Sequence, residues 1–300
     1  MKRTTLFLLV VGLRLMAQAQ PNRDSLYAVW KDPQHSDSAR ANAFNDYIWN
    51  GFIFSKPDSA YLLAEALITF GEAHDLPGQV ARAYSLQGTA LFVQTSYAKA
   101  IACYEKSLAI HEESGLKRGS AAVLGNMAVI YTKQGDYPKA LYHLQRSLVL
   151  DEEMGDKKGI GASMIGVGQI YQTQREYTKA LDYFQRGLAL LEEAGDKRSA
   201  AFALQSLGIC YKHLNDDANA VDHFQRGLAA FEGLGDLYGQ TTTQNCLGYF
   251  YSERGDKASA LDHFQRGLAL ATEIGNKRDE GVSLCAIGTT LGKMGDHGQA

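Results

Sequence analysis

The sequence repeats itself every 40 residues, and this period constrains the fold more than any other feature. The stretch 222–229 recurs letter for letter at 262–269. A fixed period of this size is typical of a solenoid, in which each unit buries its apolar face on its neighbours. Such a chain builds an open surface more readily than an enclosed active site. One alanine marks the same point of successive repeats: Ala60, Ala100, Ala140, Ala180, Ala220, Ala260 and Ala300.

Each repeat carries the pattern of two amphipathic helices, shown here for residues 196–235. Two apolar stripes with helical spacing are separated by the polar stretch 215–217. Gly235 closes the repeat and Asp236 opens the next, because glycine accepts a left-handed turn and aspartate caps a helix. No stretch alternates apolar and polar residues as a half-buried strand would. The sequence therefore predicts an all-α fold, a right-handed superhelical solenoid of antiparallel helix pairs. The stripes are Leu204, Leu207, Gly208, Tyr211 and Leu214, then Ala220, Val221, Phe224, Leu228 and Phe231.

Residues 1–19 have the three parts of a secretory signal peptide. Lys2 and Arg3 supply a positive start, residues 6–13 form a short apolar run, and 17–19 read Ala-Gln-Ala, a cleavage site. The run is shorter than the ~20 residues that a membrane span needs, so we expect no membrane insertion within this sequence. The pattern predicts an exported protein of the bacterial periplasm with a mature start near Gln20. The alternative is a cytosolic protein with an apolar start.

The rest of the chain divides into an N-terminal lead-in, 20–35, and a solenoid, 36–300, of six full repeats and a truncated seventh. The sequence ends at the first apolar residue of a second helix, so the helix expected at 277–294 would leave its apolar side bare. We expect further repeats or another domain beyond Ala300. The alternative is a natural stop with a frayed end.

No arrangement of residues predicts catalysis, a cofactor or a metal site. The glycine-rich stretch 159–168 lacks the Lys-Ser/Thr of a phosphate loop, and His111-Glu112 lacks the second histidine of a zinc helix. The net charge of −3 without a basic block argues against nucleic acid as a partner. We therefore expect a binding protein rather than an enzyme; an enzyme would need a reactive constellation that this sequence does not contain.

Histidine and cysteine positions also fit a structural role. Three histidines share one column of the repeat, but equivalent helices lie at least ~10 Å apart and zinc–nitrogen bonds are ~2 Å. We expect a solvated helix face there instead of a metal ladder. The four cysteines form no CxxC pair and fall inside expected helices, so we expect them to pack as small apolar residues. These residues are His143, His223 and His263, and Cys103, Cys210, Cys246 and Cys285.

Within each repeat the sequence resembles the tetratricopeptide repeat. A small residue stands in the first helix, an aromatic residue follows three positions later, and another aromatic follows the alanine column by four. Small residues let helices approach closely, which must offset the ~1 kcal/mol that glycine costs in a helix. The small residues are Gly88, Ala128, Gly168, Gly208, Gly248 and Gly288; the aromatic ones are Tyr131, Tyr171, Tyr211 and Tyr251, then Tyr104, Phe184, Phe224 and Phe264.

The period of 40 exceeds the common ~34 of the family. This long subclass is similar to the repeats of G-protein-signalling modulators and to exported input regions of bacterial two-component kinases, cyclases and regulators. The stretch 36–60 is similar to the opening of the second group. The resemblance implies two functional hypotheses: a scaffold or sensory input region with a transmembrane span and output domain downstream, or a free-standing periplasmic scaffold.

The resemblance also implies a protein or peptide partner, bound along the face of the first helices. Polar positions of the first helices vary between repeats, whereas second helices are nearly copied, with Gln-Arg-Gly-Leu-Ala at 185, 225 and 265. The variation indicates either individual recognition or drift at exposed positions. An amphipathic helix would suit this face. The groove-facing positions of the family correspond to Asn126, Lys133, Gln169, Gln172, Gln205, Lys212, His213, Asn245, Tyr249, Glu253 and Lys293.

Overall fold

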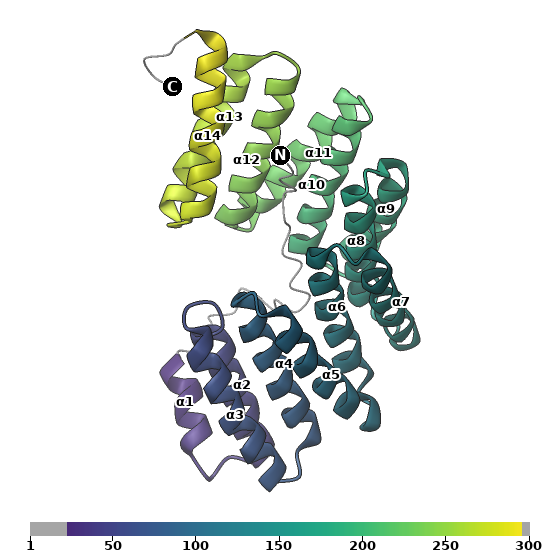
Figure 1. The fold of residues 1–300 in the computed structure, drawn as a ribbon, viewed down its shortest axis with the longest axis vertical. Helices are drawn as coiled ribbons and strands as arrows, with labels where there is room; N and C mark the ends of the chain where they lie inside the picture. Colours follow the sequence, from purple (N-terminus) through teal and green to yellow (C-terminus); the bar gives the residue numbers. More distant parts are fainter. Residues whose placement is uncertain (1–22, 296–300) are drawn as a thin grey trace. The chain divides into compact units, whose positions relative to one another are not determined.

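A computed structural model describes residues 23–295, which hold fourteen α-helices packed in consecutive antiparallel pairs (Figure 1). The expected all-α, tetratricopeptide-like solenoid is confirmed. The chain divides into two compact units, one up to Gly166 and one from Val167 onward. The expected signal peptide and Ala300 lie outside the described residues. The helices are α1 (Arg23–Lys31), α2 (Asp37–Gly51), α3 (Pro57–Ala73), α4 (Pro77–Val93), α5 (Tyr97–Glu113), α6 (Lys117–Gln134), α7 (Tyr137–Met154), α8 (Lys157–Thr173), α9 (Tyr177–Glu193), α10 (Lys197–His213), α11 (Asp217–Gly233), α12 (Leu237–Glu253), α13 (Lys257–Glu273) and α14 (Lys277–Met294).

Left-handed residues end most of these helices, as the Gly-Asp pairs predict. Gly235 has a φ of 62°, and the Asp236 carboxylate then accepts a hydrogen bond from the backbone N–H of Gly239 at 3.1 Å. The same left-handed turn is made by four residues other than glycine, which the sequence pattern did not reveal. These are Asp75, Thr95, Arg175 and Asn215, with φ between 52° and 65°.

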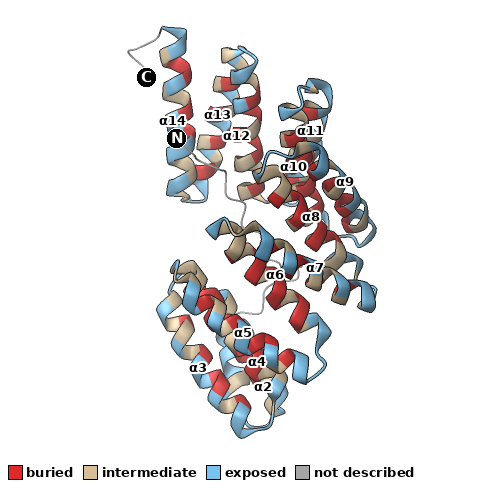
Figure 2. Cartoon of the chain, turned by 45° about the vertical axis from the view of Figure 1, so that its right-hand side comes forward, coloured by how far each residue is buried: buried red, intermediate tan, exposed pale blue. Residues whose placement is uncertain are grey.

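Aromatic rings of the second helices lie directly on glycines of the first helices. A β-carbon at Gly168 would come within 2.7 Å of Phe184, and one at Gly248 within 2.6 Å of Phe264. These rings are buried. Residues coloured as buried lie along the helix faces that meet one another (Figure 2). The small-residue column is therefore required by close helix packing.

The expected lead-in, 20–35, contains a helix that the repeat pattern did not predict. Trp30 of α1 stacks on Phe44 of α2, with ring centroids 4.3 Å apart and planes 6° from parallel. The guanidinium of Arg40 lies 4.8 Å from the centre of the Phe70 ring of α3. Helix α1 thus packs on the first helix pair through its tryptophan.

The histidine column is packed against tyrosines, so the expected solvated face was wrong. His143 is only 9% exposed, and its ring lies parallel to that of Tyr131 at 5.2 Å. His263 is half-buried and stacks in the same way on Tyr251 at 5.3 Å. The tyrosine twelve residues earlier in each case offers a flat apolar platform, which outweighs the polar neighbours of the histidine along its own helix.

The four cysteines are free thiols, and their burial differs. Cys210 is buried as expected, Cys103 and Cys246 are half-buried, and Cys285 on α14 is exposed. The expectation of four buried residues was therefore wrong for Cys285. None of the described helices combines the length and the apolar character that a membrane crossing requires.

Candidate partner-binding surface

First helices of neighbouring repeats pack directly against one another. In the first unit α4 contacts α6, and in the second unit α10 contacts α12 and α12 contacts α14. Among the described residues, the backbones of α5 and α7, of α9 and α11, and of α11 and α13 do not approach one another in this way, although Arg146 of α7 forms an ion pair with Glu112 of α5. The first helices of each unit therefore form a closely packed surface, here called the first-helix face, and the second helices stand further apart.

Two residues that the sequence assigned to partner binding are buried in the structure. Gln205 is 0% exposed, and its amide donates to the hydroxyls of Thr242 and Thr243, each at 3.1 Å. Asn245 is 7% exposed and accepts a hydrogen bond from Ser283 at 3.0 Å. Both side chains tie one first helix to the next. The assignment to direct partner contact was wrong for these two residues because their amides meet the neighbouring repeat.

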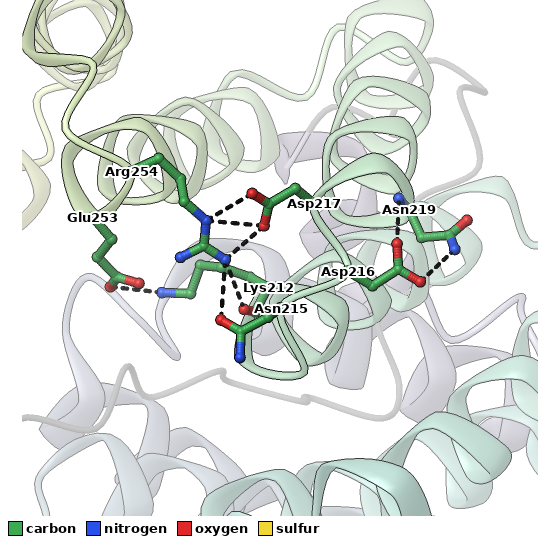
Figure 3. Close-up of polar contacts among 7 residues, drawn as sticks. All are labelled: Lys212, Asn215, Asp216, Asp217, Asn219, Glu253 and Arg254. Atoms are coloured by element: carbon green, nitrogen blue, oxygen red, sulfur yellow. Dashed lines mark hydrogen bonds and ion pairs between the residues drawn. The ribbon is translucent and has the colours of Figure 1, made fainter.

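Lys212 and Glu253 form an ion pair across the first-helix face, joining α10 to α12 at 2.9 Å (Figure 3). Beside it, the Arg254 guanidinium donates hydrogen bonds to both oxygens of the Asp217 carboxylate, at 2.6–2.9 Å. This contact lowers the pKa of Asp217. Arg254 also reaches the backbone oxygen of Lys212 at 3.3 Å. Arg254 and Asp217 were missed by the sequence analysis because Arg254 follows the last residue of α12 and Asp217 is the first residue of the second helix α11, so both lie outside the compared first-helix positions.

An aromatic pair and a glutamine lie nearby on the same unit. The exposed His213 stacks on Tyr177 of α9, with centroids 4.5 Å apart and planes 11° from parallel. Partial burial, and then the neighbouring Lys212, lower the pKa of His213. The Gln172 amide donates to the backbone oxygen of Ser206 at 3.2 Å, so part of its hydrogen-bonding capacity is used within the unit. Tyr177 was not predicted as a site residue.

The remaining candidates of the second unit are open to solvent to different degrees. Tyr249 is 43% exposed, although its ring meets that of Phe264 edge to face, with the ring centroids 5.0 Å apart. Gln169 is half-buried, and Lys293 is exposed while its backbone oxygen accepts from Lys257. An exposed tyrosine one helical turn from Glu253 gives this face an aromatic anchor beside an ion pair.

The candidates of the first unit are less open. Asn126 of α6 is half-buried, and Lys133 of the same helix lies with its ammonium 5.4 Å from the centre of the Phe92 ring of α4. A cation over an aromatic face is held by ~0.5–1 kcal/mol at exposed sites. Among the described residues, no group of three or more His, Cys, Asp or Glu side chains could hold a metal ion.

The tetratricopeptide repeat family matches this chain at residues 79–153, 159–233 and 241–274. The chain therefore belongs to the tetratricopeptide repeat family. No curated protein sequence matches it.

Solved structures share its fold at low sequence identity. A Rap protein complexed with competence and sporulation factor has a TM-score of 0.64 and 16% identity, covering 93% of this chain and 82% of its own. Aspartyl phosphate phosphatase F from Bacillus subtilis has a TM-score of 0.66 and 12% identity, and the match covers 92% of this chain and 81% of that chain. The APC/C hetero-tetramer Cut9-Hcn1 has a TM-score of 0.65 and 15% identity. The match covers 90% of this chain and 46% of that chain. At these identities the likeness concerns the fold alone.

Proposed function

We propose that this protein–protein interaction module is an exported scaffold or the sensory input region of a larger signalling protein. Its partner is a protein or peptide that binds the first-helix face of the second unit. The observation that supports this most directly is the exposure of Tyr249 next to the paired Lys212 and Glu253. Tyrosine is enriched at recognition surfaces because its ring adds contact area and its hydroxyl a hydrogen bond at little cost in conformational entropy.

The polar groups of this face already pair with one another, which favours binding over catalysis. A nucleophile or general base must have a hydrogen-bonded partner that activates it and space for a substrate. Here Lys212 is held by Glu253, and Gln205 by two threonine hydroxyls. We therefore propose that Lys212 and Glu253 take part in partner binding, that Gln205 holds neighbouring repeats together, and that none of the three catalyses a reaction.

A triple variant tests the proposed face. We would change Tyr249→Thr, Glu253→Thr and His213→Thr, since threonine stands at equivalent positions in other repeats, at Thr289 and Thr173. The chain from Gln20 onward would be immobilised, and a partner captured from a periplasmic extract would be quantified by mass spectrometry. We expect at least a tenfold loss of the captured partner without a lower melting temperature.

The matched control removes exposed arginines of second helices, Arg226→Ala with Arg266→Ala. This control should capture as much partner as the unaltered chain. Full capture by the triple variant, or an equal loss in the control, would contradict the proposed face. The signalling role is tested separately by determining the coding sequence beyond residue 300. An apolar span of ~20 residues followed by an output domain supports an input region, whereas a polar capping helix before a stop codon supports a free-standing scaffold.

A further inference from the structure

The second helices of the second unit, α9, α11 and α13, carry the same exposed residues at the same places. In α11 these are Asp222, Gln225, Arg226 and Ala229, and the residues 40 places before and after each of them are identical and also exposed. Positions i, i+3, i+4 and i+7 share one face of a helix. Each helix therefore presents one exposed stripe, and the three stripes together are here called the repeated stripe.

The buried positions of the same helices are less alike. One fully buried place holds Leu191 in α9, Phe231 in α11 and Ala271 in α13. Folding alone would favour the opposite, because core substitutions disturb packing whereas substitutions at exposed positions have little effect on stability. In the first unit the aspartate of the stripe is replaced, by Leu62 in α3 and Tyr142 in α7. The identity of the exposed residues therefore indicates a contact made outside the fold of one chain.

Each stripe is neutral, because its two charges pair with each other. The Arg226 guanidinium lies 3.3 Å from the Asp222 carboxylate, and the equivalent distances are 3.3 Å in α9 and 2.9 Å in α13. All six charged side chains are at least half exposed, so another surface can reach them. The amide of Gln225 adds a donor and an acceptor. A surface that binds the stripe must therefore offer an acid, a base and an amide together.

An antiparallel copy of the stripe offers these groups in the required order. Each residue advances a helix by ~1.5 Å, so Asp222 and Arg226 stand ~6 Å apart along α11. A two-fold axis perpendicular to the helix, midway between them, places Asp222 opposite Arg226 of the second copy and the reverse. Gln225 stands only ~1.5 Å from that midpoint, so the two amides meet and can donate to and accept from each other.

We propose that the repeated stripe binds the same stripe of a second copy of this chain, forming a dimer about a two-fold axis that runs across α9, α11 and α13. This axis sets each of the three helices against its own equivalent, so all three stripes match at once. Another protein would need acid, base and amide groups at the spacing of these helices, and a second copy has that spacing already. Because the charges stay near solvent, the dimer is weak and sensitive to salt.

Charge reversal on the full chain tests this proposal by sedimentation velocity over a range of concentrations. The acidic variant carries Arg186→Asp, Arg226→Asp and Arg266→Asp, and the basic variant carries Asp182→Arg, Asp222→Arg and Asp262→Arg. We expect the unaltered chain to form a dimer that weakens at high salt. Each variant alone sets like charges against each other and should dimerise at least ~10-fold more weakly. An equal mixture of the two should recover the dimer, because acidic stripes then meet basic ones.

A control variant changes the charge of the same three helices outside the stripe. Glu192→Lys, Glu232→Lys and Glu273→Lys alter exposed carboxylates in the last turn of each helix and shift the net charge as much as the basic variant does. This control should dimerise at least as tightly as the unaltered chain. Melting curves followed by circular dichroism report whether each variant folds, and recovery in the mixture requires that both do.

Four outcomes would overturn the proposal: an unaltered chain that stays monomeric at every concentration, variants that dimerise as tightly as the unaltered chain, folded variants whose mixture stays monomeric, or an equal loss in the control. The measurement needs no other protein, so its result is independent of the capture experiment. The arginine control of that experiment alters the repeated stripe and leaves the first-helix face intact.

Discussion

The ring of Phe224 on α11 lies so close to Gly208 on α10 that a β-carbon at residue 208 would come within 2.6 Å of it. Phe224 is fully buried, and no shift of the ring is possible without moving its neighbours. Glycine at this place is therefore a packing requirement. Helix propensity alone would favour alanine by ~1 kcal/mol.

We predict that Gly208→Ala destabilises the protein by about 1–3 kcal/mol, because overpacking outweighs the gain in helix propensity. The free energy of unfolding in urea measures this. Gly281→Ala is the matched control, since a β-carbon at this helical position of α14 would meet nothing within 4 Å. The control should stabilise the protein by ~0.5–1 kcal/mol. Similar effects of the two substitutions would refute the packing argument.

Thr95 should be a poor residue for the turn between α4 and α5. Its φ is 61°, a left-handed conformation that costs a residue with a β-carbon ~1–2 kcal/mol, and the equivalent turn after α6 uses Gly135. We predict that Thr95→Gly raises the free energy of unfolding by roughly 0.5–1 kcal/mol, after allowing for the larger entropy of glycine in the unfolded chain. Gly135→Thr should lower it. A Thr95→Gly protein that melts at a lower temperature than the unaltered chain would argue against backbone strain at residue 95.

The repeat period made the fold predictable, because one rule holds at every helix junction. Glycine followed by aspartate marked the ends, and small residues opposite aromatic ones marked the helix contacts. The left-handed conformations of Thr95 and Arg175 were not predicted, because among the residue types in these turns only glycine indicates a positive φ from the sequence. Helix α1 was missed because it stands outside the 40-residue period, and its packing depends on the contact of Trp30 with Phe44.

The candidate site was harder to predict from the sequence. A polar residue at a groove position can face a partner or the next repeat, and periodicity does not distinguish these cases. Gln205 and Asn245 face the next repeat because Thr242, Thr243 and Ser283 offer hydroxyls at the right depth. Those hydroxyls lie about 40 residues away, so the contact depends on how two repeats stack and not on any local pattern.

Asp151 gives the first unit a pH-dependent stability. Burial, and then the nearby Asp156, raise the pKa of Asp151 to about 6, although two serine hydroxyls, of Ser147 and Ser163, lie at 3.4 Å. In the unfolded chain an aspartate titrates near ~3.9. The folded state thus binds the proton more tightly, and the contribution of Asp151 to stability is fully present below pH ~4 and is lost as the pH rises through about 6.

We predict that Asp151→Asn gains stability relative to the unaltered protein as the pH is raised from about 4 to 7, and that the difference is constant above this range. Urea unfolding midpoints at several pH values would measure it. Asp151→Leu, which places the residue of Leu191 at this position, should show the same trend. Curves that stay parallel to that of the unaltered protein would mean that Asp151 is not linked to folding.

Export makes a prediction about the mature N-terminus. If the first 19 residues act as a signal peptide, processing should leave a chain that starts at Gln20 and should change the net charge from −3 to −6, because Lys2, Arg3 and Arg14 are removed and no acid is. N-terminal sequencing of protein from a periplasmic fraction measures this. Signal peptidases need small residues before the cut, so Ala19→Tyr should block processing and Gln20→Asn should not. An intact Met1 on the purified protein of the unaltered chain, found only in the cytoplasm, would exclude export and leave the apolar start without this role.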